Sequence, residues 1–418
     1  MRKMYAFLFN GKKQRDGNKR GALPGEKKET GERNYAEQRT EAGDILRAVE
    51  EFLERRYAFR FNKITETTEY RERNAPESSF AAVGQRELNS LCIAARKQGI
   101  NCWDKDISRY VNSADILPYH PFLSYMDTLP VWDGADRVEA LARRVSAEAV
   151  WVNGFHRWML GLAAQWMGRQ TLHANSVAPV LISHKQGKHK STFCKILVPD
   201  VLQGYYTDSF DISSMSVSEQ KLTAFGLINL DELDKYSPKK MALLKNLMQM
   251  AGLNIRKAYK KNYASLPRMA SFIATSNQKE LLGDPSGSRR FLCVEIHHKI
   301  DCSPIGHEQL YAQLKAELND GARYWFTGEE EAQIMQNNTA FQKQSMEKDV
   351  FFGCYRLPEP GDTPILLSGA HILGHLKKRH PAAMQGVNPT CFCKTLIALG
   401  AERIHTERGN LYRVVPVA

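Results

Sequence analysis

The segment from Val177 to Thr192 restricts the possible folds more than any other part of the sequence. It reads VAPVLISHKQGKHKST, an apolar run rich in β-branched residues followed by a polar loop that ends in Lys190-Ser191-Thr192. A buried strand, a loop and the start of a helix produce this pattern, and such a loop offers backbone N–H groups and a lysine to phosphate. The segment therefore predicts a nucleotide-binding strand–loop–helix unit within an α/β fold.

The loop departs from the G-x-x-x-x-G-K-[ST] motif at both glycine positions, which are His184 and His189 in this chain. Glycine serves at such positions because it tolerates positive φ and lets the backbone approach a ligand closely. The two histidines leave open whether the loop supports fast ATP turnover, and the alternative is an ordinary basic turn. The predicted phosphate-contacting residues are Gln186, Gly187, His189, Lys190, Ser191 and Thr192.

A second apolar run, 227–230, ends in the acidic pair Asp231-Glu232. Asp231 and the hydroxyl of Ser191 are the candidate ligands of Mg²⁺, and Glu232 is the candidate base that activates the attacking water. The alternative is a buried strand that ends in solvated acids, which occurs often. That alternative does not explain why the run follows a Lys-Ser-Thr loop at a short distance.

A third apolar run, 271–276, ends in Asn277, whose amide would sense the terminal phosphate of ATP or position the lytic water. The turn-rich segment that follows carries Arg289 and Arg290 just before another apolar run, 291–296. An arginine at this place would reach a transition-state phosphate, in its own site or in that of a neighbouring copy. The alternative is that these arginines pair with carboxylates, which we expect for at least one of them.

Four segments in this order resemble the virulence-associated E family of P-loop ATPases, which is similar to superfamily 3 helicases of the AAA+ group. They read KQGKHKSTF, LINLDELD, PRMASFIATSN and DPSGSRRF, and Trp132-Asp133-Gly134 followed by Arg137 resembles the segment that leads into that domain. The resemblance covers about residues 118–330. It implies a P-loop ATPase core, ATP hydrolysis, assembly of identical subunits into a ring such as a hexamer, and action on DNA of phages or mobile elements.

A basic segment, 254–268, precedes the Asn277 strand and contains no acidic residue. Superfamily 3 helicases place a pore-facing hairpin at this point, so the resemblance implies contacts with the backbone of single-stranded DNA. Phosphate contacts need positive charge and reach, and they carry no sequence specificity. The alternative is a solvated basic turn. The candidate DNA-binding residues are Arg256, Lys257, Lys260 and Lys261.

The composition suits a cytoplasmic protein with a polyanionic partner. The formal net charge is +12, which favours binding to nucleic acid without proving it. The sequence has no run of 18 apolar residues, so no membrane span is predicted, and the N-terminus lacks the cleavage site of a signal peptide. The eight cysteines are scattered, and several lie within apolar runs, as expected for reduced thiols in a cytosol.

Five regions are predicted along the chain, and the C-terminal one has the winged-helix pattern of two helices and a hairpin, here around Gly409-Asn410. Its residues His371, His375, Cys391 and Cys393 leave a zinc site conceivable, although the Cys-x-Cys spacing differs from common zinc motifs.

The five regions predicted along the chain are a basic disordered arm (1–40), a small α+β module (41–117), the P-loop ATPase domain (118–330), a helical connector (331–347) and the winged-helix-like domain (348–418).

The sequence hypothesis is therefore an ATP-dependent DNA helicase or remodelling ATPase that serves replication or mobilisation of a mobile genetic element. The first alternative is a DNA-binding replication or transposition accessory protein whose degenerate nucleotide site has little or no activity. A second is a nucleotide-switched assembly protein that hydrolyses slowly and moves no DNA. The acidic pair favours an active enzyme, whereas the two histidines in the loop favour the first alternative.

Overall fold

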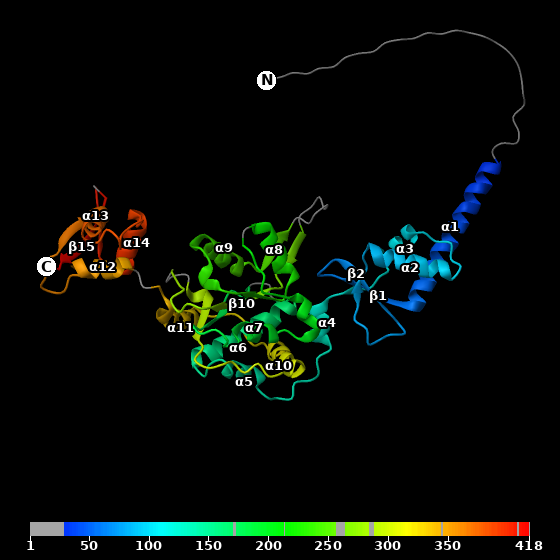
Figure 1. Ribbon diagram of the computed structural model, residues 1–418, viewed down its shortest axis with the longest axis horizontal. Helices are drawn as coiled ribbons and strands as arrows, with labels where there is room; N and C mark the ends of the chain where they lie inside the picture. The colour runs from blue at the N-terminus through cyan, green and yellow to red at the C-terminus, as the bar shows by residue number, and fades with distance from the viewer. Residues whose placement is uncertain are drawn as a thin grey trace, which may run out of the picture. The chain divides into compact units, whose positions relative to one another are not determined.

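The computed structural model divides the chain into two units, Met1–Tyr119 and His120–Ala418, which are described separately here (Figure 1). The described residues are 29–169, 173–212, 214–255, 264–283, 288–343, 346–407 and 409–417. No helix among them is long and apolar enough to cross a membrane.

The first unit combines helices with a small mixed sheet. Its sheet has the strand order β3-β2-β1-β4, in which β1 pairs antiparallel with β2 and parallel with β4. One face of the sheet packs on the helices through a buried cluster that includes Phe52, Tyr57 and Leu91. The elements are α1 (Glu29–Arg56), β1 (Tyr57–Asn62), β2 (Thr67–Glu72), β3 (Ala81–Ala82), α2 (Gln85–Lys97), α3 (Asp104–Val111) and β4 (Pro118–Tyr119).

The predicted disordered arm is wrong for its last residues, because α1 already begins at Glu29. Five of residues 29–40 are Glu or Arg, which lose little conformational freedom in a helix, and Gly31 is their only glycine. Charge density therefore did not separate a helix from a disordered segment here. Residues 1–28 lie outside the described part of the chain.

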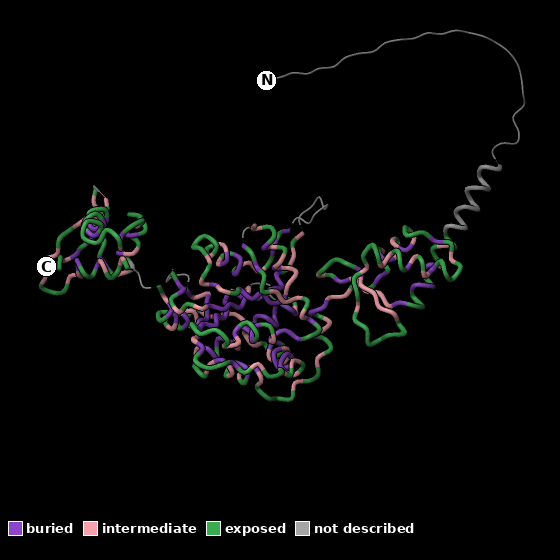
Figure 2. Tube along the Cα trace, in the orientation of Figure 1, coloured by how far each residue is buried: buried purple, intermediate pink, exposed green. Residues whose placement is uncertain are grey.

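The second unit is built on a parallel five-stranded sheet, which confirms the predicted α/β class. The strand order is β11-β5-β10-β7-β6, and every neighbouring pair is parallel. Strands covered on both faces are largely apolar. β5 and β7 are buried along their whole length, and Asn229 is the polar residue of β7. The buried residues of this unit gather around its sheet (Figure 2). The strands are β5 (Ala178–Ile182), β6 (Tyr206–Thr207), β7 (Leu227–Leu230), β10 (Ser271–Ser276) and β11 (Phe291–Glu295).

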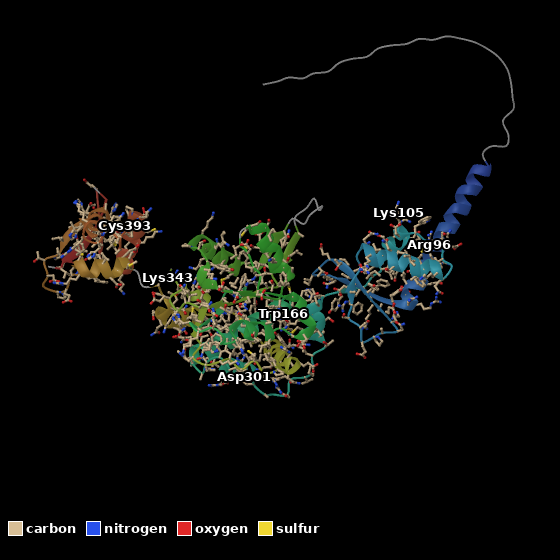
Figure 3. All side chains as sticks on the ribbon, viewed as in Figure 1. Arg96, Lys105, Trp166, Asp301, Lys343 and Cys393 are labelled. Carbon is tan, nitrogen blue, oxygen red and sulfur yellow. The ribbon has the colours of Figure 1, made fainter. Side chains whose placement is uncertain are left out.

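Helices cover both faces of this sheet, with α8 and α9 on one side and α5, α6, α7 and α10 on the other (Figure 1). The aromatic residues of α6 are buried in the core; Trp166, labelled in Figure 3, is fully enclosed. The helices are α4 (Pro121–Asp127), α5 (Arg137–Arg143), α6 (Ala149–Trp166), α7 (Lys190–Ile196), α8 (Met215–Ala224), α9 (Pro238–Gln249) and α10 (His307–Asn319), with 3₁₀ turns η1 (Asp200–Tyr205), η2 (Leu233–Lys235) and η3 (Ser288–Arg290).

The base of the predicted hairpin is present as two antiparallel strands, β8 (Gly252–Ile255) and β9 (Ala264–Pro267). Residues 256–263 lie outside the described part of the chain, so the four candidate DNA-binding residues do too. Arg268, directly after β9, is fully buried and donates hydrogen bonds to four backbone carbonyls. The hairpin base is thus joined to the core of the sheet by a buried guanidinium group.

The predicted helical connector is partly wrong. Helix α11 (Gly328–Asn337) is followed by a 3₁₀ turn, η4 (Asn338–Phe341), rather than by a continuous helix. The buried Asn338 donates from its amide to the carbonyls of Ser288 and Phe291, and these tertiary contacts replace further helical turns. Helicity resumes only after residues 344–345, which are outside the described residues.

The C-terminal region forms its own buried cluster around Ile372, Phe392 and Tyr412. The predicted helices are present, but the hairpin turn is displaced: Gly409 pairs with Thr406, so Gly409-Asn410 lies within a strand. The pairing of Asn410 with His405 extends the ladder beyond the expected turn. The elements are α12 (Met346–Cys354), β12 (Tyr355–Arg356), β13 (Ile365–Ser368), α13 (Gly369–Arg379), α14 (Pro389–Ala398), β14 (Arg403–Thr406) and β15 (Gly409–Pro416).

Candidate active site

Three neighbouring strands end in the predicted site residues. Lys190 follows the loop after β5, Asp231 follows β7, and Asn277 follows β10. In a parallel sheet the carboxyl ends of the strands meet at one edge, where α/β proteins bind their ligands. Because β10 lies between β5 and β7, Asn277 stands between the lysine and the acid.

The loop between β5 and α7 has left-handed backbone at two residues, Gly187 (φ +74°) and His189 (φ +62°). His189 occupies the second glycine position of the motif, so a side chain is present where the backbone still has a conformation typical of glycine. Histidine is among the residues that adopt this conformation more often than most. His184, at the first glycine position, does not have positive φ.

The segment after β11 supports this loop from outside. The N–H of Ile300 donates to the carbonyl of Lys188, at 3.2 Å. The Nζ atom of Lys188 in turn donates to the carbonyl of His297, at 2.8 Å. The loop therefore accepts one hydrogen bond from this segment and donates one to it, and the two bonds hold the loop against the residues after β11.

Lys190 is 9% exposed and directs its ammonium group to the strand ends. Its Nζ donates to the carbonyl of Ser183, at 3.0 Å, and to Oδ1 of Asn277, at 2.9 Å. Burial lowers the pKa of Lys190, and the nearby carboxylates oppose this shift. Both hydrogen-bond acceptors of the ammonium group are neutral oxygens, and the carboxylates of Asp231 and Asp234 act on it through their charge alone.

The two residues predicted to bind Mg²⁺ are in direct contact. The hydroxyl of Ser191 donates to Oδ1 of Asp231, at 3.1 Å. Mg²⁺ takes oxygen ligands and often binds through one or two carboxylates together with substrate phosphates and water. This pair fits such an ion, although the described residues contain no group of three or more metal-ligating His, Cys, Asp or Glu side chains.

Glu232 has left-handed backbone with φ +53°, which turns the chain sharply after β7. Its Oε2 atom accepts from Nζ of Lys235, at 2.5 Å. The predicted base is therefore held in an ion pair three residues along its own turn. A water-activating role requires that this contact leave one carboxylate oxygen available to the water.

Two further residues, which the sequence analysis did not select, join the acidic turn to β10. The hydroxyl of Thr275 donates to Oδ1 of Asp231, at 2.5 Å, and accepts from the N–H of Glu232, at 3.3 Å. Oδ1 of Asp234 accepts from the hydroxyl of Ser276 and from the N–H of Asn277. Thr275 and Asp234 both lie within the motifs quoted above. No rule based on sequence spacing, however, pairs a residue of one strand with the turn that follows another strand.

The arginines are not brought to this edge. The 3₁₀ turn η3, which holds Arg289 and Arg290, directly precedes β11, so both arginines lie near the amino-terminal end of that strand, about 16 Å of strand length from the opposite edge. The hydrogen-bonding partner of Arg289 is on helix α11. Nη1 of Arg289 pairs with Oε2 of Glu331, at 2.9 Å, as expected for at least one of the two. Within one chain, Arg289 and Arg290 therefore lie away from the strand ends that carry Lys190, Asp231 and Asn277.

The C-terminal histidine and cysteine set gains no support as a zinc site. Nδ1 of His375 forms a 2.7 Å hydrogen bond with the hydroxyl of Tyr355. In the described part of the chain no group of three or more potential metal ligands is present.

Comparison with known proteins gives one family and one further domain. The family model of the virulence-associated protein E-like domain matches residues 126–343, and a domain of unknown function (DUF3874) matches residues 344–414. No curated protein matches the chain.

Solved structures similar to the chain include two of the NrS-1 C-terminal region without ligand. One shares 12% identity with a TM-score of 0.44 and covers 90% of this chain and 99% of that chain. The other shares 13% identity with a TM-score of 0.42 and covers 88% and 99%. Since the first family model spans more than half of the 418 residues, the chain belongs to the virulence-associated protein E-like domain family.

Proposed function

We propose that the chain is an ATP-dependent DNA helicase or remodelling ATPase, with a P-loop core of the AAA+ type, that serves replication or mobilisation of a mobile genetic element. One observation carries the proposal. Lys190 contacts Asn277, and Ser191 contacts Asp231, at the carboxyl edge of three adjacent strands. These are the side-chain types that a nucleoside triphosphate with Mg²⁺ requires, in mutual reach.

In this proposal Lys190 neutralises the β- and γ-phosphates. The backbone N–H groups of Gln186, Gly187, His189 and Thr192 complete the phosphate contacts. The hydroxyl of Ser191 and the carboxylate of Asp231 would hold Mg²⁺, and the ion would supply positive charge that offsets that of the phosphates. The left-handed backbone of His189 supports this assignment, because the substituted residue keeps the conformation that glycine has in the motif.

Glu232 is the proposed base and Asn277 the proposed sensor of the γ-phosphate. Glu232 would accept a proton from the attacking water through the carboxylate oxygen that Lys235 does not hold. Asn277 uses Oδ1 to accept from Lys190, so its amide nitrogen remains to donate to a phosphate or water. In this scheme the hydrogen bond from Lys190 therefore fixes which way the side-chain amide of Asn277 faces.

Arg289 and Arg290 would act only on the site of another copy, because they lie at the opposite edge of their own sheet. A site at one edge and its arginine at the other produce a head-to-tail contact, which forms a ring when the rotation from subunit to subunit closes. We propose a homo-oligomeric ring, as the hexamer implied by the resemblance. Single-stranded DNA would contact Arg256, Lys257, Lys260 and Lys261, which precede the Asn277 strand in the sequence.

A second candidate function is a DNA-binding accessory protein with a weakly active or inactive nucleotide site. Two observations favour it: the histidines at the glycine positions and the ion pair between Glu232 and Lys235. Steady-state ATP hydrolysis with and without single-stranded DNA, beside Lys190→Ala, separates the two. DNA-stimulated turnover that the substitution removes supports the ATPase, whereas DNA binding without turnover supports the accessory protein. A strand-displacement assay then separates a motor from a nucleotide switch.

A further inference from the structure

We propose that Thr275 and Asp234 are positioning residues that hold the acidic turn and the end of β10 in one fixed arrangement. The inference rests on the proposed nucleotide site and adds two side chains that contact neither phosphate nor metal in that scheme. Each belongs to one of the two segments and bonds to the other, so the segments are tied in both directions.

Thr275 makes the first connection through a single hydroxyl. The register pairs Ala274 with Leu230, so Thr275 and Asp231 are the next residues along the two strands. A carboxylate only accepts, so the hydroxyl hydrogen points to Asp231 and a lone pair remains for the N–H of Glu232. Thr275 is 3% exposed and β-branched, which restricts its rotamers and hence the direction of both bonds.

Asp234 makes the return connection. Its Oδ1 accepts from the hydroxyl of Ser276, at 2.9 Å, and from the N–H of Asn277, at 3.1 Å. The neighbouring Leu233 is completely buried, which fixes the turn that presents this carboxylate. Asn277 is therefore held through its backbone while its side chain accepts from Lys190.

The two connections serve different parts of the site. Thr275 orients Asp231, the proposed metal ligand, so its loss acts on metal affinity. Asp234 orients Asn277 and through it Lys190, so its loss acts on the binding of nucleotide phosphates. Groups that orient a metal ligand typically change metal affinity by about 10- to 100-fold when they are removed.

The test uses the full chain, Mn²⁺ as a spectroscopic probe for the metal, and ADP. Mn²⁺ affinity is measured by electron paramagnetic resonance at saturating ADP, and ADP affinity is measured by calorimetry in EDTA. We expect Thr275→Val to weaken Mn²⁺ binding by about tenfold or more and to leave metal-free ADP binding unchanged. Thr275→Ser, which keeps the hydroxyl, should restore Mn²⁺ binding, and Thr339→Val on the exposed surface is the matched control.

The Asp234 variants test the other connection and are independent of how well Thr275→Val folds. Asp234→Ala should weaken metal-free ADP binding, while Asp234→Asn keeps an acceptor oxygen and should retain most of it. Equal Mn²⁺ and ADP affinities in Thr275→Val, Asp234→Ala and the wild type would overturn the inference and leave the nucleotide site intact. A wild-type chain that binds neither ADP nor Mn²⁺ would overturn the proposed function and the inference with it.

Discussion

Replacing Lys190 with methionine removes the ammonium charge and keeps most of the side-chain length. Without nucleotide, two effects oppose each other. The substitution removes the two hydrogen bonds that the ammonium group donates to Ser183 and Asn277, each of which contributes about 1.5–3 kcal/mol to stability. The fold in turn no longer carries the desolvation cost of a buried ammonium, which is several kcal/mol. We therefore expect the free energy of unfolding to change by no more than about 2 kcal/mol.

With nucleotide the effect is much larger. Mg²⁺ and ATP at about 100 times Kd should stabilise the wild type by about 2.7 kcal/mol, which raises Tm by about 5–10 °C for a domain of this size. Loss of a charge-assisted contact to phosphate weakens binding by about 1.5–3 kcal/mol. At the same ATP concentration the stabilisation of Lys190→Met then falls to about 1.4 kcal/mol or less.

Thermal unfolding followed by scanning fluorimetry, with and without Mg²⁺ and ATP, measures both effects. Lys195→Met is the matched control, because Lys195 is an exposed lysine on the same helix α7. We expect this control to keep the full nucleotide-dependent shift. A Lys190→Met variant whose shift equals that of a responsive wild type would refute the assigned role of Lys190.

Four further outcomes are expected. Glu232→Gln should abolish ATP turnover and spare ATP binding in a filter assay; unchanged turnover would remove Glu232 from the role of base. Because burial lowers the pKa of Lys190, ADP affinity should decline with rising pH at a lower pH than an ordinary lysine would produce, which titration calorimetry across alkaline pH detects. Hydrogen bonding to Arg323 lowers the pKa of Glu330 to about 2, so its stabilising contribution is present above its ordinary pKa and is lost as pH falls towards 2. Glu330→Gln should therefore lower Tm at pH 7 and reduce the acid dependence of Tm between pH 4.5 and 2. Finally, Arg289→Ala subunits mixed with Lys190→Ala subunits should regain turnover if the arginine acts between copies, and no recovery at any ratio would count against a site shared between subunits.

The central contacts of the site follow from rules that the sequence carries. An apolar run that ends in a polar residue predicts a buried strand whose last side chain reaches the carboxyl edge of a parallel sheet. This reasoning selected Lys190, Ser191, Asp231 and Asn277, and the structure brings these residues into two hydrogen-bonded pairs. The amphipathic spacing of α2 and the buried aromatic face of α6 are likewise local features, because both depend on residues close in sequence.

The outcome at His189 was open because the sequence reports the side chain but not the backbone. Histidine in place of glycine suggested a damaged loop, whereas the surrounding contacts hold this residue in the left-handed conformation. The displaced hairpin turn near Gly409 has the same cause: a glycine marks a place where unusual φ is tolerated and does not specify which residues pair.

Tertiary structure alone decided which strand lies beside which. Sequence order places β10 after β7, while the sheet inserts it between β5 and β7. That insertion puts Thr275 beside Asp231 and lets Asp234 reach Asn277. The parallel direction of β11 places the two arginines, which precede it, at the amino-terminal edge of the sheet. The sequence by itself determined the strand–loop–helix unit, the acidic pair and the α/β class, because hydrophobic period and turn chemistry are local. Strand order and the contacts across it depend on long-range packing, which no short spacing encodes.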